Sequence, residues 1–180
     1  MTTPTPFASL DAEALYATLR NAVARLLAGL PAENTHLLGI YSGGGWIAER
    51  LQKDLGLAGE PGFLNISFYR DDYEKIGLHS EVRPTSVPFD VQDKHLIVLD
   101  DVLYTGRTIR GAMNELFDYG RPASIKLAVL VDRGGRELPV AADIAALTVA
   151  LDPQQTLVLS QHEGRFHFEF ESQSPEPDHA

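Results

Sequence analysis

The chain contains no cysteine, which excludes disulfide bonds, a thiol nucleophile and any metal site built on thiolates. It also lacks an apolar run near the ~20 residues that a membrane-spanning helix needs. The N-terminal sequence MTTPTP has neither the basic start nor the apolar stretch of a secretory signal peptide. Together these absences predict a cytoplasmic protein.

Positive charge is scarce as well. Lysine and arginine number 15 against 25 acidic residues, so the net charge is −10. Proteins that bind nucleic acids usually carry a basic face, because cations must neutralise the phosphates that they contact. The first predicted helix carries only Arg20 and Arg25, which Asp11 and Glu13 balance. The charge distribution therefore argues against strong RNA binding.

The chain does have a regular alternation of apolar segments and helical patterns. Its 180 residues, 44% of them hydrophobic, suffice for one domain with a substantial core. We predict a single domain over 1–170 and a polar, disordered tail over 171–180. Helices are expected at 9–30 (with Ser9 as N-cap), 46–55 and 109–119, strands at 36–41, 63–68, 96–99 and 124–131, and a hairpin at 156–160 and 165–170. Strands that alternate with helices predict an α/β fold with a parallel sheet.

The most informative segment is LIVLDDVLYTGRT at residues 96–108. Its apolar start predicts a buried strand that ends in two carboxylates, Asp100 and Asp101. A loop of small and hydroxylated residues then leads into a helix: Tyr104, Thr105, Gly106, Arg107 and Thr108. Backbone N–H groups at the start of a helix bind anions, and glycine lets the backbone come close to them. The loop therefore predicts a phosphate site, and the acids beside it predict ligands for sugar hydroxyls or Mg²⁺.

This segment resembles the phosphoribosyl-pyrophosphate (PRPP) signature of type I phosphoribosyltransferases. With FYRDDYEKIGL at 68–78 and VLVDRGGRELP at 129–139, the chain is similar to the PyrR family of pyrimidine-operon regulators, which also act as uracil phosphoribosyltransferases. The resemblance implies a type I phosphoribosyltransferase-like parallel sheet flanked by helices, with a flexible lid loop and a small C-terminal hairpin. It also implies Mg²⁺ as cofactor. Asp100 and Asp101 would then be the catalytic residues, holding the ribose hydroxyls directly or through the metal.

A second candidate anion site is the glycine-rich segment that follows the first predicted strand. By resemblance it is the pyrophosphate loop, where PyrR proteins typically have Thr-Arg-Gly and this chain has Ser42, Gly43 and Gly44. The missing arginine removes a guanidinium that can hold pyrophosphate through two hydrogen bonds. We therefore expect the substitution Gly43→Arg to tighten PRPP binding.

The polar segment 69–90 is expected to be a long loop, and long loops in compact domains often close over ligands. Its resemblance to the lid of related transferases assigns Tyr69, Arg70 and Arg83 to it. The two arginines are candidates to meet the leaving pyrophosphate.

The base pocket is expected after strand 124–131. By resemblance Asp132 and Arg133 line it, whereas Arg136 and Glu137 are interpreted as a structural ion pair. Ligands of parallel sheets bind beyond the carboxyl ends of the strands, so all these loops are expected at one edge.

Two functions of different classes are compatible with these motifs. The first is an enzyme that converts uracil and PRPP into UMP and pyrophosphate. The second is an RNA-binding attenuator of pyrimidine genes that senses UMP through the same site. The signature is common to both, and the charge distribution favours the enzyme. Transfer to another base, such as a purine or orotate, is a third possibility, and a homo-oligomer, at least a dimer, is expected by resemblance.

Overall fold

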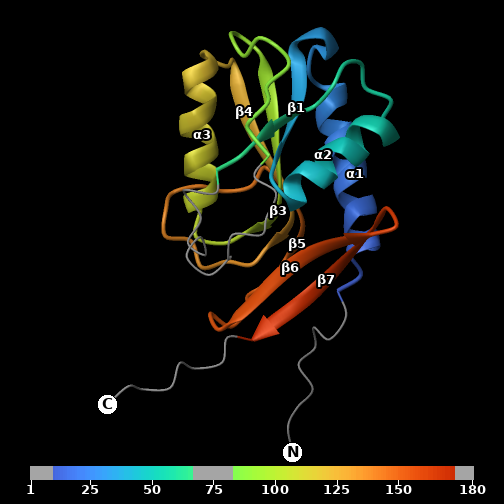
Figure 1. Ribbon diagram of the computed structural model, residues 1–180, viewed down its shortest axis with the longest axis vertical. Coiled ribbons are helices and arrows are strands. Elements are labelled where there is room, and N and C mark those ends of the chain that lie inside the picture. Colours follow the sequence, from blue (N-terminus) through green and yellow to red (C-terminus); the bar gives the residue numbers. More distant parts are fainter. Residues whose placement is uncertain (1–9, 67–82, 173–180) are drawn as a thin grey trace, which may run out of the picture.

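A parallel sheet of five strands forms the centre of the molecule, shown in Figure 1 as a computed structural model. The structure describes residues 10–66 and 83–172. The strands are β1 Thr35–Ile40, β2 Gly62–Leu64, β3 His95–Leu103, β4 Ser124–Asp132 and β5 Ile144–Thr148. Their order in the sheet is β2–β1–β3–β4–β5, and all neighbouring pairs are parallel. The predicted α/β fold with a parallel sheet is confirmed.

Helices cover both faces of this sheet. They are α1 Ala12–Ala28, α2 Gly43–Asp54 and α3 Arg107–Tyr119, with a 3₁₀ turn, η1, at Ala32–Asn34. In Figure 1, α1 and α2 lie on one side of the sheet and α3 lies on the other. Two hydrophobic layers result, one with Leu19, Val23 and Ile47 and one with Ile109 and Leu116. No helix in the described part of the chain is long and apolar enough to cross a membrane.

The predicted C-terminal hairpin is present as β6 Gln155–His162 and β7 Arg165–Ser172. Glu163 and Gly164 form its turn with positive φ angles of 51° and 76°, as tight hairpins favour. Alternation along the strands directs Leu157, Leu159 and Phe166 into the layer that contains α1 and α2. The hairpin therefore closes one end of that layer, at the bottom of Figure 1.

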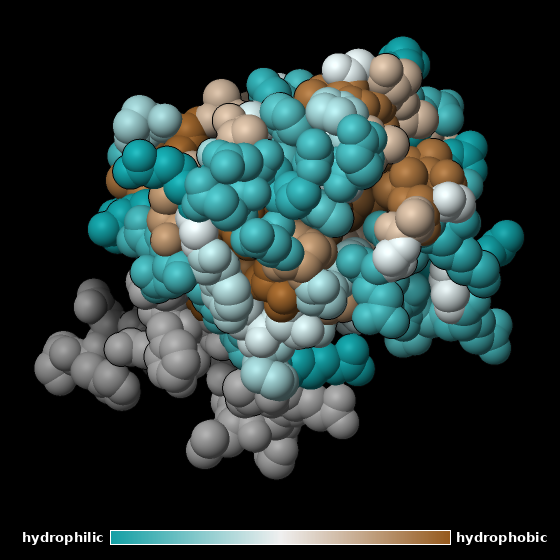
Figure 2. Space-filling view, turned by 90° about the horizontal axis from the view of Figure 1, so that it is seen from above, coloured by the Kyte–Doolittle hydropathy of each residue, from teal (hydrophilic) through white to brown (hydrophobic). Residues whose placement is uncertain are grey.

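The outer surface is mostly hydrophilic when the molecule is seen from above, and its hydrophobic side chains form separate patches (Figure 2). Phe117 and Tyr119 are 55% and 47% exposed. Both belong to the last turn of α3. The carboxyl end of α3 thus presents two aromatic rings to solvent.

Several boundaries differ from those predicted. The N-cap of α1 is Asp11 rather than Ser9, because the Asp11 carboxylate accepts a hydrogen bond from Ala14 N–H at 3.0 Å. Strand β2 ends at Leu64, short of the predicted strand over 63–68. Strand β5 is absent from the sequence prediction, because alanine and leucine supply three of its five residues and carry little strand signal.

A partly buried cluster around Arg50 joins α1, α2 and the hairpin. The Arg50 guanidinium donates two hydrogen bonds to Glu13, at 2.7 and 2.8 Å, and lies 4.1 and 4.9 Å from the ring centres of Tyr16 and Phe166. Glu13 also accepts from Phe166 N–H, and Tyr16 donates to Asp54, each at 2.8 Å. Hydrogen bonding to Arg50 lowers the pKa of Glu13 to about 2, and burial raises the pKa of Tyr16. The cluster fixes the hairpin against α2.

Replacing Glu13 by glutamine should destabilise the fold. Hydrogen bonds to charged groups contribute about 1.5–3 kcal/mol, so Glu13→Gln should lower the free energy of unfolding by roughly that amount at neutral pH. Urea unfolding measures the change. Glu49→Gln, on the exposed face of α2 and next to Arg50 in the chain, is the matched control and should change little.

The same carboxylate should make stability depend on pH. Its pKa of about 2 in the folded state lies below the ordinary value of 4.5, so its contribution is complete above pH 4.5 and is lost as the pH falls toward 2. Between about pH 5 and pH 3 the unaltered protein should therefore lose more stability than Glu13→Gln. Parallel pH curves for the two proteins would contradict the assignment.

Candidate active site

Three loops with different chemistry meet at the carboxyl edge of the sheet. Strand β1 ends at Ile40 and leads to the glycine-rich turn, β3 ends at Leu103 and leads to the phosphate loop, and β4 ends at Asp132. Because these three strands are adjacent and parallel, their carboxyl ends lie side by side. Ligands of such sheets bind beyond this edge, so the predicted convergence of the loops is present.

The phosphate loop, residues 104–108, ends in the first turn of α3. Helix α3 begins at Arg107, two residues before its predicted start, and Gly106 is its N-cap with a φ of 94°. The hydroxyl of Thr105 is buried with its residue, which is 8% exposed, and accepts a hydrogen bond from Arg107 N–H at 3.3 Å. The first turn of α3 carries no acidic residue. An anion is therefore favoured here by the amides and by the helix dipole.

Glycine is required at position 106 for two reasons. Its φ is in the left-handed region, and a Cβ there would lie 2.4 Å from Val140 Cγ2. Residues 133–140, the segment that follows β4, therefore pack directly against the phosphate loop. This segment is called the buttress below.

Arg107, the cation of the phosphate loop, forms an ion pair with Glu137 of the buttress. Its Nε and Nη2 atoms lie 2.9 and 2.8 Å from Glu137 Oε2. The predicted pair between Arg136 and Glu137 is thus wrong, because Arg136 pairs with Asp132 instead, at 2.6 Å. The turn at Gly134 and Gly135, whose φ angles are 73° and 76°, brings the Arg136 side chain back to Asp132.

Asp100 and Asp101 lie inside β3 rather than at its end, because the strand continues to Leu103. Successive side chains of a strand point to opposite faces. Asp100 pairs in register with Val129, which belongs to the hydrophobic layer of α3, and is only 7% exposed. Asp101 lies on the other face, beside Gly43 of α2. The two carboxylates therefore leave the strand on opposite faces, close to its carboxyl end.

Because its residues are glycines, the first turn of α2 packs in direct contact with β3. A Cβ on Gly44 would lie 2.2 Å from the Leu99 carbonyl oxygen, and a Cβ on Gly39 would lie 2.3 Å from the Gly44 carbonyl oxygen. A Cβ on Gly43 would lie 2.6 Å from Asp101 Oδ2. This packing overrides the low helix propensity of glycine, so α2 begins at Gly43 and not at the predicted Trp46. The Asp101 carboxylate consequently lies beside the positive end of α2.

Two aromatic rings and an arginine flank the glycine-rich turn. Tyr41, which precedes Ser42 through a cis peptide bond, stacks on Phe63 with 5.1 Å between ring centres. The Arg83 guanidinium lies 6.0 Å from the centre of the Tyr41 ring. Of the three predicted lid residues, Arg83 is thus close to the turn, whereas Tyr69 and Arg70 lie outside the described residues.

The chain on either side of residues 67–82 is tied to α3. Asn65 N–H donates to the Thr85 hydroxyl at 2.9 Å, and that hydroxyl also bonds to Glu115. The Asn65 side chain donates to the Arg83 carbonyl oxygen at 2.6 Å. Sequence reasoning missed Asn65, Thr85 and Glu115, since no local pattern relates residues so far apart.

The two predicted base-pocket residues have different surroundings. Asp132 accepts from Arg136 and from Gly134 N–H; burial alone would raise the pKa of Asp132, but these hydrogen bonds outweigh it and lower the pKa. Arg133 is 5% exposed and donates to the carbonyl oxygens of Gln155 and Asp152, at 2.7 and 3.0 Å. Its guanidinium also lies 4.0 Å from the Tyr104 ring centre. Arg133 therefore links the phosphate loop to the start of the hairpin.

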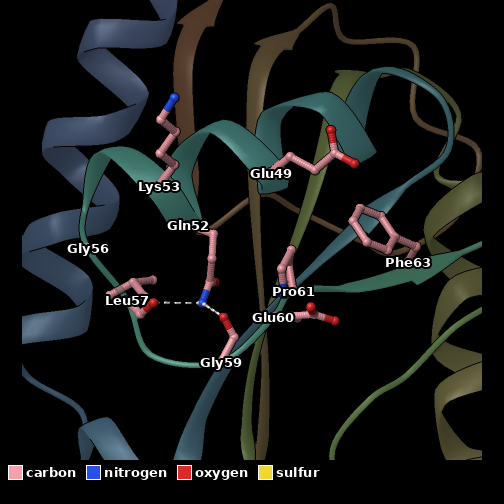
Figure 3. A pocket seen from close by; sticks show the side chains of 9 residues that line it. All are labelled: Glu49, Gln52, Lys53, Gly56, Leu57, Gly59, Glu60, Pro61 and Phe63. Atoms are coloured by element: carbon pink, nitrogen blue, oxygen red, sulfur yellow. Dashed lines mark hydrogen bonds between the residues drawn. The ribbon is translucent and has the colours of Figure 1, made fainter.

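A shallow pocket lies at the opposite edge of the sheet, where residues 56–61 connect α2 to β2 (Figure 3). The side chain of Gln52 donates to the carbonyl oxygens of Leu57, Ala58 and Gly59 and holds this connection in place. Glu49 and Lys53 of α2 line the pocket with opposite charges. None of its lining residues belongs to the predicted site.

Known proteins resemble this chain in sequence and in fold. The phosphoribosyl transferase domain family matches residues 9–155. A Bifunctional protein PyrR from Ralstonia nicotianae is 53% identical over 84% of this chain and 87% of its own length. The chain belongs to the PyrR family of phosphoribosyltransferases. Another PyrR relative, from Nitrosococcus oceani, is 47% identical over 89% of this chain and 91% of its own.

Solved structures show how general this PyrR fold is. A hypoxanthine-guanine phosphoribosyltransferase from Bacillus anthracis superimposes with a TM-score of 0.62 at 18% identity, over 78% of this chain and 83% of its own. The enzyme from Leishmania tarentolae, in complex with GMP, gives 0.59 at 21% identity, over 83% and 85%. At these identities the likeness establishes the fold alone, which is the predicted type I phosphoribosyltransferase fold.

The close approach of Gly43 to Asp101 reverses the expectation for Gly43→Arg. Any side chain at position 43 must displace the Asp101 carboxylate, so the arginine should lower turnover rather than improve PRPP binding. A misplacement of about 1 Å can cost roughly 10²-fold in rate. Steady-state kinetics with PRPP as the varied substrate measures the effect.

Gly43→Ala separates this steric effect from the added charge and should lose activity as well. Gly29→Ala is the matched control, because a Cβ there meets its nearest neighbour at an ordinary 3.6 Å. Faster turnover or a lower KM for PRPP in Gly43→Arg would refute the steric account and restore the sequence-based expectation.

Proposed function

We propose that this phosphoribosyltransferase transfers the ribosyl 5-phosphate group of PRPP to uracil and releases UMP and pyrophosphate. The observation that carries the proposal is the pair of helix amino ends, α2 and α3, at one sheet edge with the acids of β3 between them. PRPP has the matching pattern: a phosphate at one end, a pyrophosphate at the other and a diol between.

Different groups of residues would bind the different parts of PRPP. The amides of Thr105, Gly106, Arg107 and Thr108, with the two threonine hydroxyls, would hold the 5-phosphate, and Tyr104 leads into the same loop. Ser42, Gly43 and Gly44 at the start of α2 would hold the pyrophosphate, with Arg83 nearby. Asp100 and Asp101 would hold the ribose hydroxyls, and Asp132 and Arg133 would border the base.

The reaction needs positioning and charge stabilisation more than covalent chemistry. Displacement at C1 passes through an oxocarbenium-like state, in which positive charge develops on the sugar. Carboxylates beside the ribose favour that charge, and amides at two helix ends favour the separating anions. Holding base and sugar at the same sheet edge removes the entropic cost of bringing them together.

Mg²⁺ fits this arrangement. It usually binds one or two protein carboxylates together with substrate phosphates, and Asp101 lies at the end of α2 where the pyrophosphate would be held. In the part of the chain that the structure describes, no three acidic or histidine side chains gather into a metal site. A Mg²⁺ ion that is bound together with PRPP needs only one or two protein carboxylates, and Asp100 and Asp101 are the candidates. When bound, Mg²⁺ would neutralise charge on the leaving pyrophosphate.

Uracil is proposed as the base on the strength of the family. The relatives at 47% and 53% identity are named PyrR, whereas the purine enzymes share only the fold. Orotate and the purines are the alternative bases.

The direct test is an activity assay with PRPP, Mg²⁺ and a panel of uracil, orotate, hypoxanthine and guanine. Uracil should be consumed with release of pyrophosphate, and Asp101→Asn should keep the fold but lose roughly 10²–10³ in rate. Consumption of another base in preference to uracil would refute the base assignment. A folded Asp101→Asn with undiminished turnover would refute the role given to the carboxylate.

RNA binding is the second candidate function, because PyrR relatives are named bifunctional. The charge distribution argues for weak binding. Among the described cations, Arg50, Arg107, Lys126 and Arg136 each form an ion pair with an acid. Lys126 is one of the residues that a basic patch with Arg20 and Arg25 would need, and it lies 3.0 Å from Asp143.

We therefore expect weak binding to the leader transcript of pyrimidine genes. A gel-shift titration at about 150 mM salt measures it, since each phosphate contact to single-stranded RNA adds about 0.7 to the salt slope. Few contacts predict weak binding with a shallow slope. Nanomolar, UMP-enhanced binding would instead establish regulation as a main function.

The expected homo-oligomer stays a prediction. The exposed rings of Phe117 and Tyr119 on α3 support it, since aromatic residues are enriched in subunit interfaces.

A further inference from the structure

Arg136 of the buttress makes hydrogen bonds in three directions. Its Nη2 atom lies 2.7 and 2.6 Å from the two carboxylate oxygens of Asp132. Its Nη1 atom donates to the Tyr104 carbonyl oxygen at 2.6 Å, and its Nε atom donates to the Val140 carbonyl oxygen at 3.1 Å. The side chain is largely buried, with 23% of its surface exposed. One guanidinium thus joins the end of β4, the phosphate loop and the far end of the buttress.

The buttress makes backbone contacts with the next peptide of the phosphate loop. Glu137 N–H and Leu138 N–H both donate to the Thr105 carbonyl oxygen, at 2.9 and 3.1 Å. The carbonyl groups of Tyr104 and Thr105 therefore both point toward the buttress. Arg136 holds the first of them, and the backbone of residues 137–138 holds the second.

These contacts fix the direction of two amides. In a planar trans peptide the C=O and the following N–H point in opposite directions. The Tyr104 carbonyl shares its peptide with the N–H of Thr105, and the Thr105 carbonyl shares its peptide with the N–H of Gly106. Both N–H groups consequently point away from the buttress, toward the side of the loop where an anion would bind.

We propose that Arg136 is a positioning residue for 5-phosphate binding: by holding the Tyr104 carbonyl, it aims the Thr105 amide at the phosphate. The inference rests on the proposed function, in which residues 104–108 bind the 5-phosphate. Arg136 itself does not touch the ligand. Its contact with Asp132 at the end of β4 sets where the guanidinium lies, so the loop is aligned with the sheet.

The planar fork of arginine is needed for this role. Lysine has a single ammonium group and can keep the ion pair with Asp132, but it cannot also reach the Tyr104 and Val140 carbonyl oxygens in a fixed geometry. Arg136→Lys should therefore retain the charge and lose the alignment of the loop. Asp132→Asn should instead remove the ion pair and keep the alignment of the loop. Arg136 can still donate to the Tyr104 and Val140 carbonyl oxygens in that variant.

Calorimetric titration of the full chain with ribose 5-phosphate, without base or metal, measures the loop directly. Arg136→Lys should weaken binding by about tenfold, the loss expected for one charge-assisted hydrogen bond. In turnover assays the KM for PRPP should rise in proportion, and kcat should change less. Asp132→Asn should weaken binding less than Arg136→Lys does. Lys126→Gln removes an exposed ion pair of β4, the strand that ends in Asp132, and is the matched control.

The outcomes separate this inference from the proposed function. Unchanged affinity for ribose 5-phosphate in Arg136→Lys would overturn the inference, whatever its effect on unfolding by urea. Weakened affinity with a preference for a base other than uracil would support the inference and refute the base assignment. If ribose 5-phosphate does not bind the unaltered protein, residues 104–108 are not the phosphate site and the proposed function fails first.

Discussion

The first turn of α2 packs on β3 without a side chain between them, and the candidate active site depends on that contact. Gly39, Gly43 and Gly44 each approach a neighbour to a distance at which a Cβ would collide. The helix can therefore begin immediately after β1 and direct its amino end at the acids of β3. A larger residue at Gly39 or Gly44 would collide with backbone atoms and force the helix away from the sheet, and the distance between the two anion sites would change. A larger residue at Gly43 would displace the Asp101 carboxylate.

The remaining contacts hold the phosphate loop in place relative to the amino end of α2. The phosphate loop is fixed from behind by the buttress, through Gly106 against Val140, Arg107 with Glu137, and Arg136 with the Tyr104 carbonyl. Arg133 reaches from the same segment to the start of the hairpin, and the cluster around Arg50 fixes the hairpin to α2. The two helix ends are thus connected through the hairpin as well as through the sheet.

Sequence reasoning predicted the local structure of residues 96–108 because all of the signals are local: apolar strand, acids, small residues and helix follow one another within thirteen residues. It also predicted the parallel sheet and the hairpin, since both depend on short periodic patterns. It failed where tertiary packing decides. The helical state of Gly43–Gly45 and the direction of Asp100 and Asp101 follow from contacts between β1, α2 and β3. The ion pairs of Arg136 and Arg107 join residues whose distance the sequence does not reveal.

The most direct test of the account is a crystal structure of the protein with UMP. The phosphate should lie against the amides of residues 105–108, the ribose hydroxyls should face Asp100 and Asp101, and the uracil ring should lie near the end of β4. A phosphate bound at the start of α2, or a nucleotide in the pocket between α2 and β2, would contradict the assignment of the site.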